Sequence, residues 1–207
     1  MIAARQIAFG RGGKRLPYDA EVEYLESTST QYIDTGFLCS GADEISITVF
    51  INSNDNGYWP YCGAAGNAHA WCTSGKCRFG GDNYANINKY VLRGGWNTIT
   101  VNKSFTTING ITEPMTLDRF DGVSNLTYSI FTANGLGANA PSLKIASFSW
   151  KHNGIIVLNI IPVRFTNEDG VSEGAMYDKV SGQLFRNVGA GAFIIGPDVA
   201  SANGRGV

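Results

Sequence analysis

The sequence predicts an all-β protein built as a two-sheet antiparallel sandwich. Three observations lead to this prediction. Apolar and polar residues alternate over short segments, which is the pattern of half-buried strands. Clusters rich in Gly, Asn, Asp and Ser separate these segments, and such clusters form turns. No window of about eleven residues or more has the apolar spacing of an amphipathic helix.

The composition agrees with one folded domain of this class. The chain has 207 residues, 43% of them hydrophobic and only 16% charged, so it carries enough apolar material for a core. Its 26 Gly suit tight turns, and its 9 Tyr and 11 Phe suit pleated strands. The formal net charge of -1 gives the body no general attraction for nucleic acid or anionic membranes. No segment predicts membrane insertion, and no signal peptide is visible in this chain.

The strands can be placed in order along the chain. They are expected at residues 22–25, 31–34, 45–51, 96–101, 105–108, 115–117, 126–131, 143–150 and 155–163. Asn-Gly pairs at 109–110 and 153–154 predict two-residue hairpin turns. The apolar run 155–163 predicts a central strand, with Pro162 at its end or at a bulge, because proline has no N–H for the ladder.

The two ends of the chain differ from its body. Residues 1–16 carry four basic side chains and no acid, and their glycines disfavour a helix, which predicts a flexible basic arm. We expect the arm to become ordered against a partner, with a solvated tail as the alternative. Its partner-binding residues would be Arg5, Phe9, Arg11, Lys14 and Arg15. Residues 17–199 form the folded domain, and residues 200–207 predict a mobile C-terminal tail.

The four cysteines are too few to be the framework of a domain this long. Cys72 and Cys77 flank a short loop and would face each other across a hairpin. A disulfide between them is one interpretation, and reduced, inert thiols are the favoured one. The state of Cys62 is equally open. Neither histidine lies at a zinc-finger spacing from these residues, so structural zinc is not expected.

Two segments carry a family resemblance. They are residues 24–36, YLESTSTQYIDTG, and residues 174–198, GAMYDKVSGQLFRNVGAGAFIIGPD. They resemble the opening and closing segments of concanavalin A-like, laminin-G-like jelly-roll domains of gut bacterial surface proteins and phage virion proteins. The resemblance implies that residues 17–199 are a lectin-like jelly roll whose first and last strands lie side by side. Residues 37–150 share only the strand rhythm, so the resemblance transfers no ligand residues.

The aromatic and Asn-rich segment 57–90 is the expected binding surface. Flat aromatic faces stack on sugar rings, and side-chain amides bond the hydroxyls, so this mixture is typical of glycan sites. The candidate glycan-binding residues are Trp59, Tyr61, Trp71, Asn83, Tyr84 and Asn86. A subunit interface and plain core packing are the alternatives for the same segment.

No catalytic residue is expected. Glu21, Glu23 and Glu26 have a spacing close to that of retaining glucanases with this fold, but on a plain strand Glu26 points away from the other two. A solvated strand edge is the favoured interpretation. Asp118 and Asp121 are weak calcium candidates, with turn capping favoured, and no other metal or cofactor is expected.

The leading functional hypothesis is a non-enzymatic structural or adhesion component, such as a capsid decoration, fibre or tail protein of a bacteriophage virion. It would be a homo-oligomer that contacts other virion or cell-surface subunits and binds glycans. Its expected location is the virion or the extracellular bacterial cell surface. The alternative is a stand-alone carbohydrate-binding module of a bacterial surface or secreted protein, and a divergent glycoside hydrolase ranks third.

Overall fold

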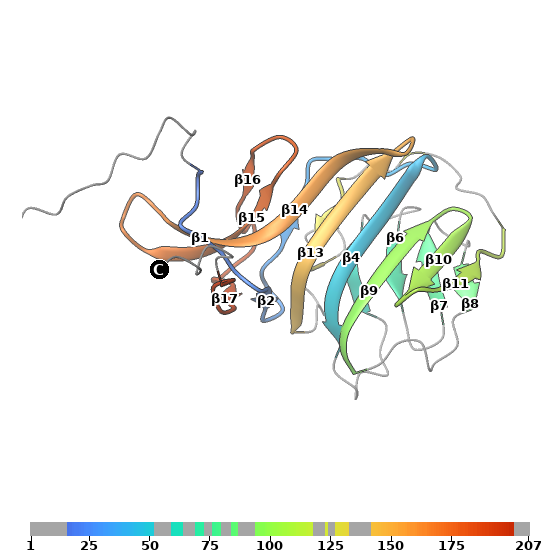
Figure 1. Ribbon diagram of the computed structural model, residues 1–207, viewed down its shortest axis with the longest axis horizontal. Coiled ribbons are helices and arrows are strands. Elements are labelled where there is room, and N and C mark those ends of the chain that lie inside the picture. The colour runs from blue at the N-terminus through green and yellow to red at the C-terminus, as the bar shows by residue number, and fades with distance from the viewer. Residues whose placement is uncertain are drawn as a thin grey trace, which may run out of the picture.

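The computed structural model describes residues 16–51, 59–63, 69–72, 76–79, 84–86, 94–117, 123, 127–132 and 142–200. All regular secondary structure in these residues is β-strand, which confirms the all-β prediction. Every described strand pair is antiparallel. The described strands form two sheets (Figure 1).

The larger sheet contains eleven of the described strands. They are β1 (Ala20–Glu21), β2 (Leu25–Ser27), β4 (Asp43–Ile51), β9 (Gly95–Asn102), β10 (Phe105–Ile108), β11 (Ile111–Pro114), β13 (Leu143–His152), β14 (Ile155–Thr166), β15 (Ser172–Asp178), β16 (Leu184–Phe185) and β17 (Ile194–Ile195). The main path runs β11-β10-β9-β4-β13-β14-β15-β16. Strand β1 pairs with β14, and β2 pairs with both β13 and β17.

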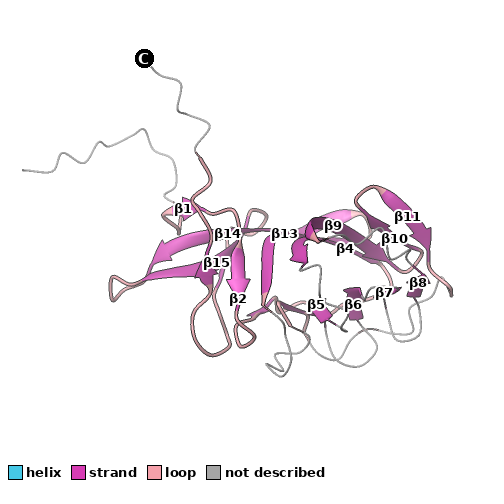
Figure 2. Cartoon of the chain, turned by 90° about the horizontal axis from the view of Figure 1, so that it is seen from below, coloured by secondary structure: helices cyan, strands magenta, loops and turns pink. Residues whose placement is uncertain are grey.

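The smaller sheet contains six of the described strands. In their spatial order they are β3 (Ile33–Asp34), β12 (Ser129–Ile130), β5 (Trp59–Gly63), β6 (His69–Cys72), β7 (Lys76–Phe79) and β8 (Tyr84–Asn86). This sheet lies against the half of the larger sheet that contains β4, β9 and β10 (Figure 2). Two facing antiparallel sheets are the arrangement expected of a β-sandwich.

The core lies between the two sheets and follows from strict alternation along β4. Ile45, Ile47 and Val49 are buried on the inner side of this strand. They belong to one cluster of buried side chains with Phe79 of β7 and Ile130 of β12. Burying each such side chain contributes about 1.5–3 kcal/mol relative to leaving it in water. The same alternation leaves the even-numbered residues of β4 on the outer face, where they are partly exposed.

Both Asn-Gly hairpin predictions are confirmed. At the β10–β11 turn, Asn109 has a φ of 50° and Gly110 a φ of 85°. At the β13–β14 turn, Asn153 has a φ of 49° and Gly154 a φ of 78°. Positive φ at both central residues is the requirement of the turn type that suits twisted two-residue hairpins.

The strand predicted at residues 115–117 is wrong. The observed strand is β11, at Ile111–Pro114, and Thr116 and Leu117 lie in a bend after it. The turn at Asn109 and Gly110 pairs Ile111 directly with Ile108, so the returning strand begins immediately after the glycine. The strand was predicted from the apolar residues Met115 and Leu117. Its position is set instead by the turn at Asn109 and Gly110.

Pro162 lies inside β14, opposite Met176, and not at the strand end or at a bulge as predicted. The strand tolerates it because β14 changes partners at this point. The last pair with β13 is Phe148–Ile160, and the first pair with β1 is Glu21–Val163. The Pro162 carbonyl accepts a bond from the Val22 N–H at 3.0 Å. The position without an N–H therefore lies where β14 stops pairing with β13 and starts pairing with β1.

The cysteines divide into two kinds. Cys77 is disulfide-bonded, and its cross-strand partner in the β6–β7 register is Cys72. The favoured prediction of reduced thiols is therefore wrong at Cys77, because the hairpin brings the two positions opposite each other. Cys39 and Cys62 are free and buried. Burial raises the pKa of the Cys62 thiol to about 12, although a hydrogen bond from the Tyr128 hydroxyl at 3.0 Å lowers it.

Cys39 and Cys62 are expected to be unreactive in the folded protein, because thiolate is the reactive form and both thiols are buried. Ellman's reagent should detect no thiol at neutral pH before unfolding. After unfolding without reductant it should detect two thiols per chain, and after reduction four, the number of cysteines in the sequence. Rapid labelling of the native protein, confirmed by peptide mapping at Cys39 or Cys62, would contradict the buried placement.

The two ends of the folded domain are joined through Gln31. Its side chain is buried, and its Nε2 donates to the Ala190 carbonyl at 3.0 Å. Its Oε1 accepts from the Thr28 N–H at 2.7 Å, within the β2–β3 turn. One amide side chain therefore closes a local turn and also holds the loop between β16 and β17. Pairing of Leu25 in β2 with Ile195 in β17 brings the second and the last of the described strands side by side.

Asn187 makes the reciprocal connection from the C-terminal side. Its Oδ1 accepts from the Tyr32 N–H at 3.0 Å and from the Gly189 N–H at 2.9 Å. Its Nδ2 donates to the Gly191 carbonyl at 2.8 Å. Gly189 is required here because a Cβ at this position would lie 1.8 Å from the Thr30 carbonyl oxygen. The two loops therefore touch backbone to backbone.

Replacing Asn187→Ala should lower the free energy of unfolding by about 2–4 kcal/mol, because it leaves several backbone groups without partners. Val188→Ala is the matched control, since Val188 is exposed and its backbone bond to Tyr32 does not depend on the side chain. Chemical denaturation monitored by tryptophan fluorescence measures both changes. Equal stability of the two variants would show that this connection is not important for the fold.

Candidate functional site

The outer face of β13, β4 and β9 carries a regular array of side chains that we call the outer strip. Its residues lie opposite one another in the strand registers and form four rows of three. The rows are Lys144, Phe50 and Trp96; Ser147, Thr48 and Thr98; Ser149, Ser46 and Thr100; and Lys151, Glu44 and Asn102. The outer strip is therefore aromatic at one end, hydroxylated in the middle and charged at the other end.

The aromatic end is built around Trp96. Its side chain lies on the outer face, and the residue is 45% exposed. Phe50 meets the Trp96 ring edge to face, with ring centroids 5.5 Å apart. Tyr24, which precedes β2, also lies beside Trp96, with the two ring centroids 6.0 Å apart. These contacts hold the indole in place and leave part of it accessible to a ligand.

Lys144 completes the aromatic end. Its ammonium lies 4.8 Å from the centre of the Tyr24 ring and 5.4 Å from that of Phe50, within the range of cation–π attraction. The same ammonium lies 3.8 Å from a carboxylate oxygen of Glu26. A second donor, the Ser142 hydroxyl, bonds the other oxygen of Glu26 at 2.7 Å. The charge of Lys144 is therefore balanced locally.

The middle rows are held by hydroxyl pairs. The Ser46 and Thr100 hydroxyl oxygens are 2.9 Å apart, and those of Thr48 and Thr98 are 3.2 Å apart. Each pair uses one hydroxyl hydrogen, so one further O–H and spare lone pairs remain to bond a ligand. Cross-strand pairs of this kind also stabilise the sheet.

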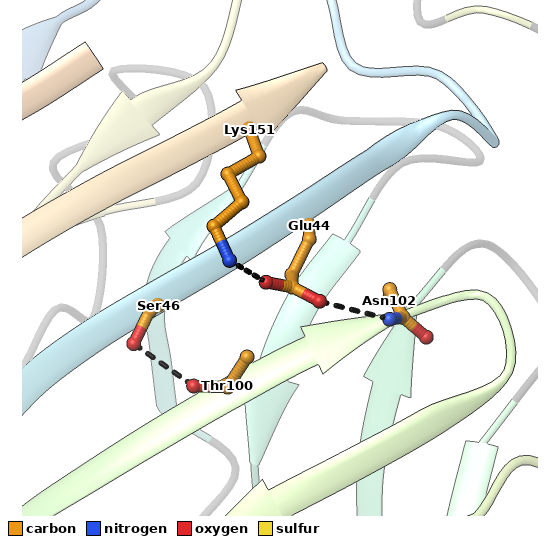
Figure 3. A network of polar contacts seen from close by, with 5 residues as sticks. All are labelled: Glu44, Ser46, Thr100, Asn102 and Lys151. Atoms are coloured by element: carbon orange, nitrogen blue, oxygen red, sulfur yellow. Dashed lines mark hydrogen bonds and ion pairs between the residues drawn. The ribbon is translucent and has the colours of Figure 1, made fainter. Parts of the chain in front are cut away.

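The charged end is a preformed network (Figure 3). Lys151 Nζ donates to Glu44 Oε1 at 2.7 Å, and Asn102 Nδ2 donates to Glu44 Oε2 at 3.2 Å. The Glu44 carboxylate is thus held from both neighbouring strands, with Lys151 on one side and Asn102 on the other (Figure 3). It retains acceptor capacity, because a carboxylate offers about four lone-pair positions.

An open polar hollow of about 530 Å³ adjoins this end. Residues 41–44, 102–104, 151, 153 and 154 line it, so it lies where β4 begins and where the β9–β10 and β13–β14 turns meet. Asp43 forms its buried wall. One Asp43 oxygen lies 2.7 Å from His152 Nδ1, and the other accepts from the Ser40 N–H. Both oxygens of the Asp43 carboxylate are therefore engaged within the protein.

The three glutamates near the start of the chain do not share one strand, because Glu23 lies between β1 and β2. Glu21 lies in β1, accepts from the Tyr18 hydroxyl at 3.1 Å and lies 3.7 Å from the Lys179 ammonium. Glu26 lies in β2, where Lys144 and Ser142 engage it. A retaining glycosidase needs two carboxyl groups about 5 Å apart on one substrate. Here the two carboxylates pair with different lysines, Lys179 in the turn after β15 and Lys144 in β13.

Most of the predicted glycan-binding residues lie in described strands, but only two of them have described side chains. The strands that contain Trp59, Tyr61 and Trp71 are described, but their side chains are not, and Asn83 is outside altogether. Tyr84 and Asn86 lie in β8 at the edge of the smaller sheet, half-buried and exposed, respectively. The outer strip lies on the other sheet, so the structure does not bring these two residues to it.

Other predicted residues are also outside the described ranges. The arm residues Arg5, Phe9, Arg11, Lys14 and Arg15 and the calcium candidates Asp118 and Asp121 belong to this group. Leu16 and Ala200 are the described residues of the predicted arm and tail. Among the described residues, no three His, Cys, Asp or Glu side chains gather closely enough to hold a metal ion.

The outer strip was not predicted from the sequence, although the sequence contains a signal for it. Along β4 and β9 the outward positions are polar except for Phe50 and Trp96. An aromatic residue at the solvent-facing position of an alternating strand marks a contact surface more specifically than aromatic content does. Only the strand register, however, shows that Phe50 and Trp96 lie opposite each other.

Fold and surface together define an all-β protein of two antiparallel sheets with a polar and aromatic outer face. Comparisons of the chain with protein-family models, with curated proteins and with solved structures found no match. The described residues also contain no helix of the length and apolarity needed to cross a membrane. A function for this chain therefore has to follow from its own residues.

We expect no glycoside hydrolase activity, because the glutamates are engaged separately. Wild type, Glu21→Gln and Glu26→Gln should all release no more reducing sugar from a β-glucan panel than a protein-free blank. The melting temperatures should also stay close together, since both ion pairs remain partly open to solvent and such pairs contribute about 0–1 kcal/mol. Release of sugar by wild type that either substitution abolishes would overturn this prediction.

Proposed function

We propose that the protein is a non-enzymatic structural or adhesion component that binds glycans through the outer strip. The observation that carries the proposal is the partly exposed Trp96, which lies in an aromatic row directly beside two rows of hydroxyl side chains. Carbohydrate presents apolar C–H faces and hydroxyl rims, so a binding surface for it needs both kinds of side chain close together.

A contact between protein surfaces suits the outer strip less well. The centre of a protein interface is apolar and depleted of charge. In the outer strip only one row is aromatic, and that row also contains Lys144. Lys151 and Glu44 lie in the row at the opposite end of the strip. The middle rows offer hydroxyl groups with little apolar area. Sugar hydroxyls are the partners that such rows can bond.

The aromatic segment 57–90 is a second proposed glycan surface. Trp59, Tyr61, Trp71, Asn83, Tyr84 and Asn86 are its proposed residues, and the mixture of aromatic and amide side chains supports it. Strands β5 to β8 of this segment belong to the smaller sheet. The two proposed surfaces are therefore on different sheets and can be tested separately by substitution.

The proposal extends to assembly and location. Within it, the fold is a concanavalin A-like jelly roll, and residues 1–16 attach a homo-oligomer to other subunits of a virion or a bacterial cell surface. The basic, acid-free composition of residues 1–16 and the family resemblance at both chain ends support this part. A stand-alone carbohydrate-binding module is the competing assignment, and it differs in needing no attachment arm.

Trp96→Ala should weaken glycan binding by about 1–3 kcal/mol, roughly 5- to 150-fold in Kd, because an aromatic stacking contact is lost. Trp96→Phe should retain part of the affinity. Val171→Ala in the exposed β14–β15 turn is the control and should bind as wild type does. A glycan array identifies the ligand, calorimetry measures its affinity, and melting temperatures confirm folding. Absence of any glycan ligand would contradict the proposed function. Binding that survives Trp96→Ala would exclude the outer strip and leave segment 57–90 as the remaining proposed surface.

A further inference from the structure

We propose that the outer strip takes an extended, uncharged polysaccharide chain that runs along β4 and β9 from Trp96 toward the polar hollow. This inference rests on the proposed function and makes it more specific. It assigns the class of ligand, a neutral chain of several sugar units, and the direction in which that chain lies. The alternative within the same function is a single terminal sugar held at Trp96.

The length of the outer strip supports a chain ligand. Its rows follow one another at every second residue of β4, from Phe50 to Glu44. At a rise of about 3.3 Å per residue, these six steps span about 20 Å. Every row offers a stacking surface or a hydrogen-bonding group, and the open hollow continues the path beyond Glu44. A single sugar ring would cover only a fraction of this length.

The direction follows from where the neighbouring strands end. Strand β10 ends at Ile108, which pairs with Ile99, so no residue of β10 lies beside Trp96 in the register. The aromatic row therefore has no continuation across the sheet toward β10 and β11. Along β9, by contrast, Trp96 is followed on the same face by Thr98, Thr100 and Asn102. A ligand that stacks on Trp96 finds further partners along the strands.

The charges of the outer strip favour an uncharged ligand. The Lys144 ammonium lies 3.8 Å from Glu26, and the Lys151 ammonium lies 2.7 Å from Glu44. Lys103 lines the hollow and is itself engaged by another group. Lys144 and Lys151, the two lysines of the outer strip, are thus each paired with a carboxylate. An anionic polysaccharide would have to compete with Glu26 and Glu44 for them, whereas a neutral chain would leave the pairs intact.

The hydroxyl rows allow a conservative test. Thr100→Val removes a hydroxyl that lies two rows from Trp96 and keeps the β-branched shape that suits a strand. Thr112→Val is the matched control. Thr112 lies on β11 and shares a hydroxyl pair of 2.8 Å with Thr107, which is opposite Thr100. The control thus makes the same change in the same kind of pair, two strands away.

The experiment measures affinity against ligand length with the full chain. A glycan array that holds length series of neutral glucans, galactans and mannans and of acidic alginates and pectins identifies the best series. Calorimetry then gives Kd for its dimer, tetramer and hexamer. For a neutral series we expect at least a tenfold gain from dimer to hexamer. Thr100→Val should weaken the hexamer about 3- to 10-fold, and Thr112→Val should leave it unchanged.

The possible outcomes separate the inference from the proposed function. Equal affinity for dimer and hexamer, with loss in Trp96→Ala alone, would overturn the extended chain and leave glycan binding intact. Weakening by Thr112→Val as strong as that by Thr100→Val would overturn the direction. A preference for an acidic series, lost at high salt, would overturn the uncharged ligand. Binding that survives Trp96→Ala would remove the outer strip as a glycan surface together with the inference, and no binding to any series would remove the proposed function as well.

Discussion

The connection between the two ends of the folded domain is the constraint on which the rest of the structure depends. Gln31 and Asn187 hold the β2–β3 turn against the loop between β16 and β17 through bonds to backbone atoms. The C-terminal segment also contacts Tyr24, which lies beside the outer strip. The Gly196 N–H donates to the Tyr24 carbonyl at 2.9 Å, and a Cβ at Gly196 would lie 2.9 Å from the Tyr24 ring. The C-terminal segment thereby positions an aromatic side chain beside Trp96.

The two segments on which the proposed family resemblance rests, residues 24–36 and 174–198, use polar side chains to bond backbone groups. Asp178 accepts from the Asn159, Val180 and Ser181 N–H groups. Burial by itself would raise the pKa of Asp178, but these bonds bring it below its ordinary value. Asn187 and Gly189 have equally local tasks. Residues of this kind define a fold, whereas ligand contacts can differ from one protein to another on the same fold.

The elements that could be predicted from the sequence are those whose geometry depends on residues close together in the chain. The Asn-Gly turns followed from their need for positive φ, and the position of Cys77 opposite Cys72 followed from a short loop. The strand at residues 115–117 was misplaced because its position depends on the preceding turn. Pro162 could not be placed from the sequence, because the change of partner strand around it is a tertiary feature. The outer strip was missed for the same reason, since it arises from the alignment of three strands that are distant in the sequence.

The proposed binding surface, the outer strip, uses other residues of β4 than the core does. On β4 the inward residues Ile45, Ile47 and Val49 belong to the core, whereas the outward residues contribute mainly to the strip. The outward groups are already ordered by one another: Trp96 by Phe50, and Glu44 by Lys151 and Asn102. Ordering side chains on binding costs about 0.5–1.5 kcal/mol for each rotamer-rich side chain that becomes immobilised. Because much of this ordering is complete before a ligand arrives, a flat and shallow surface can retain useful affinity without a deep pocket.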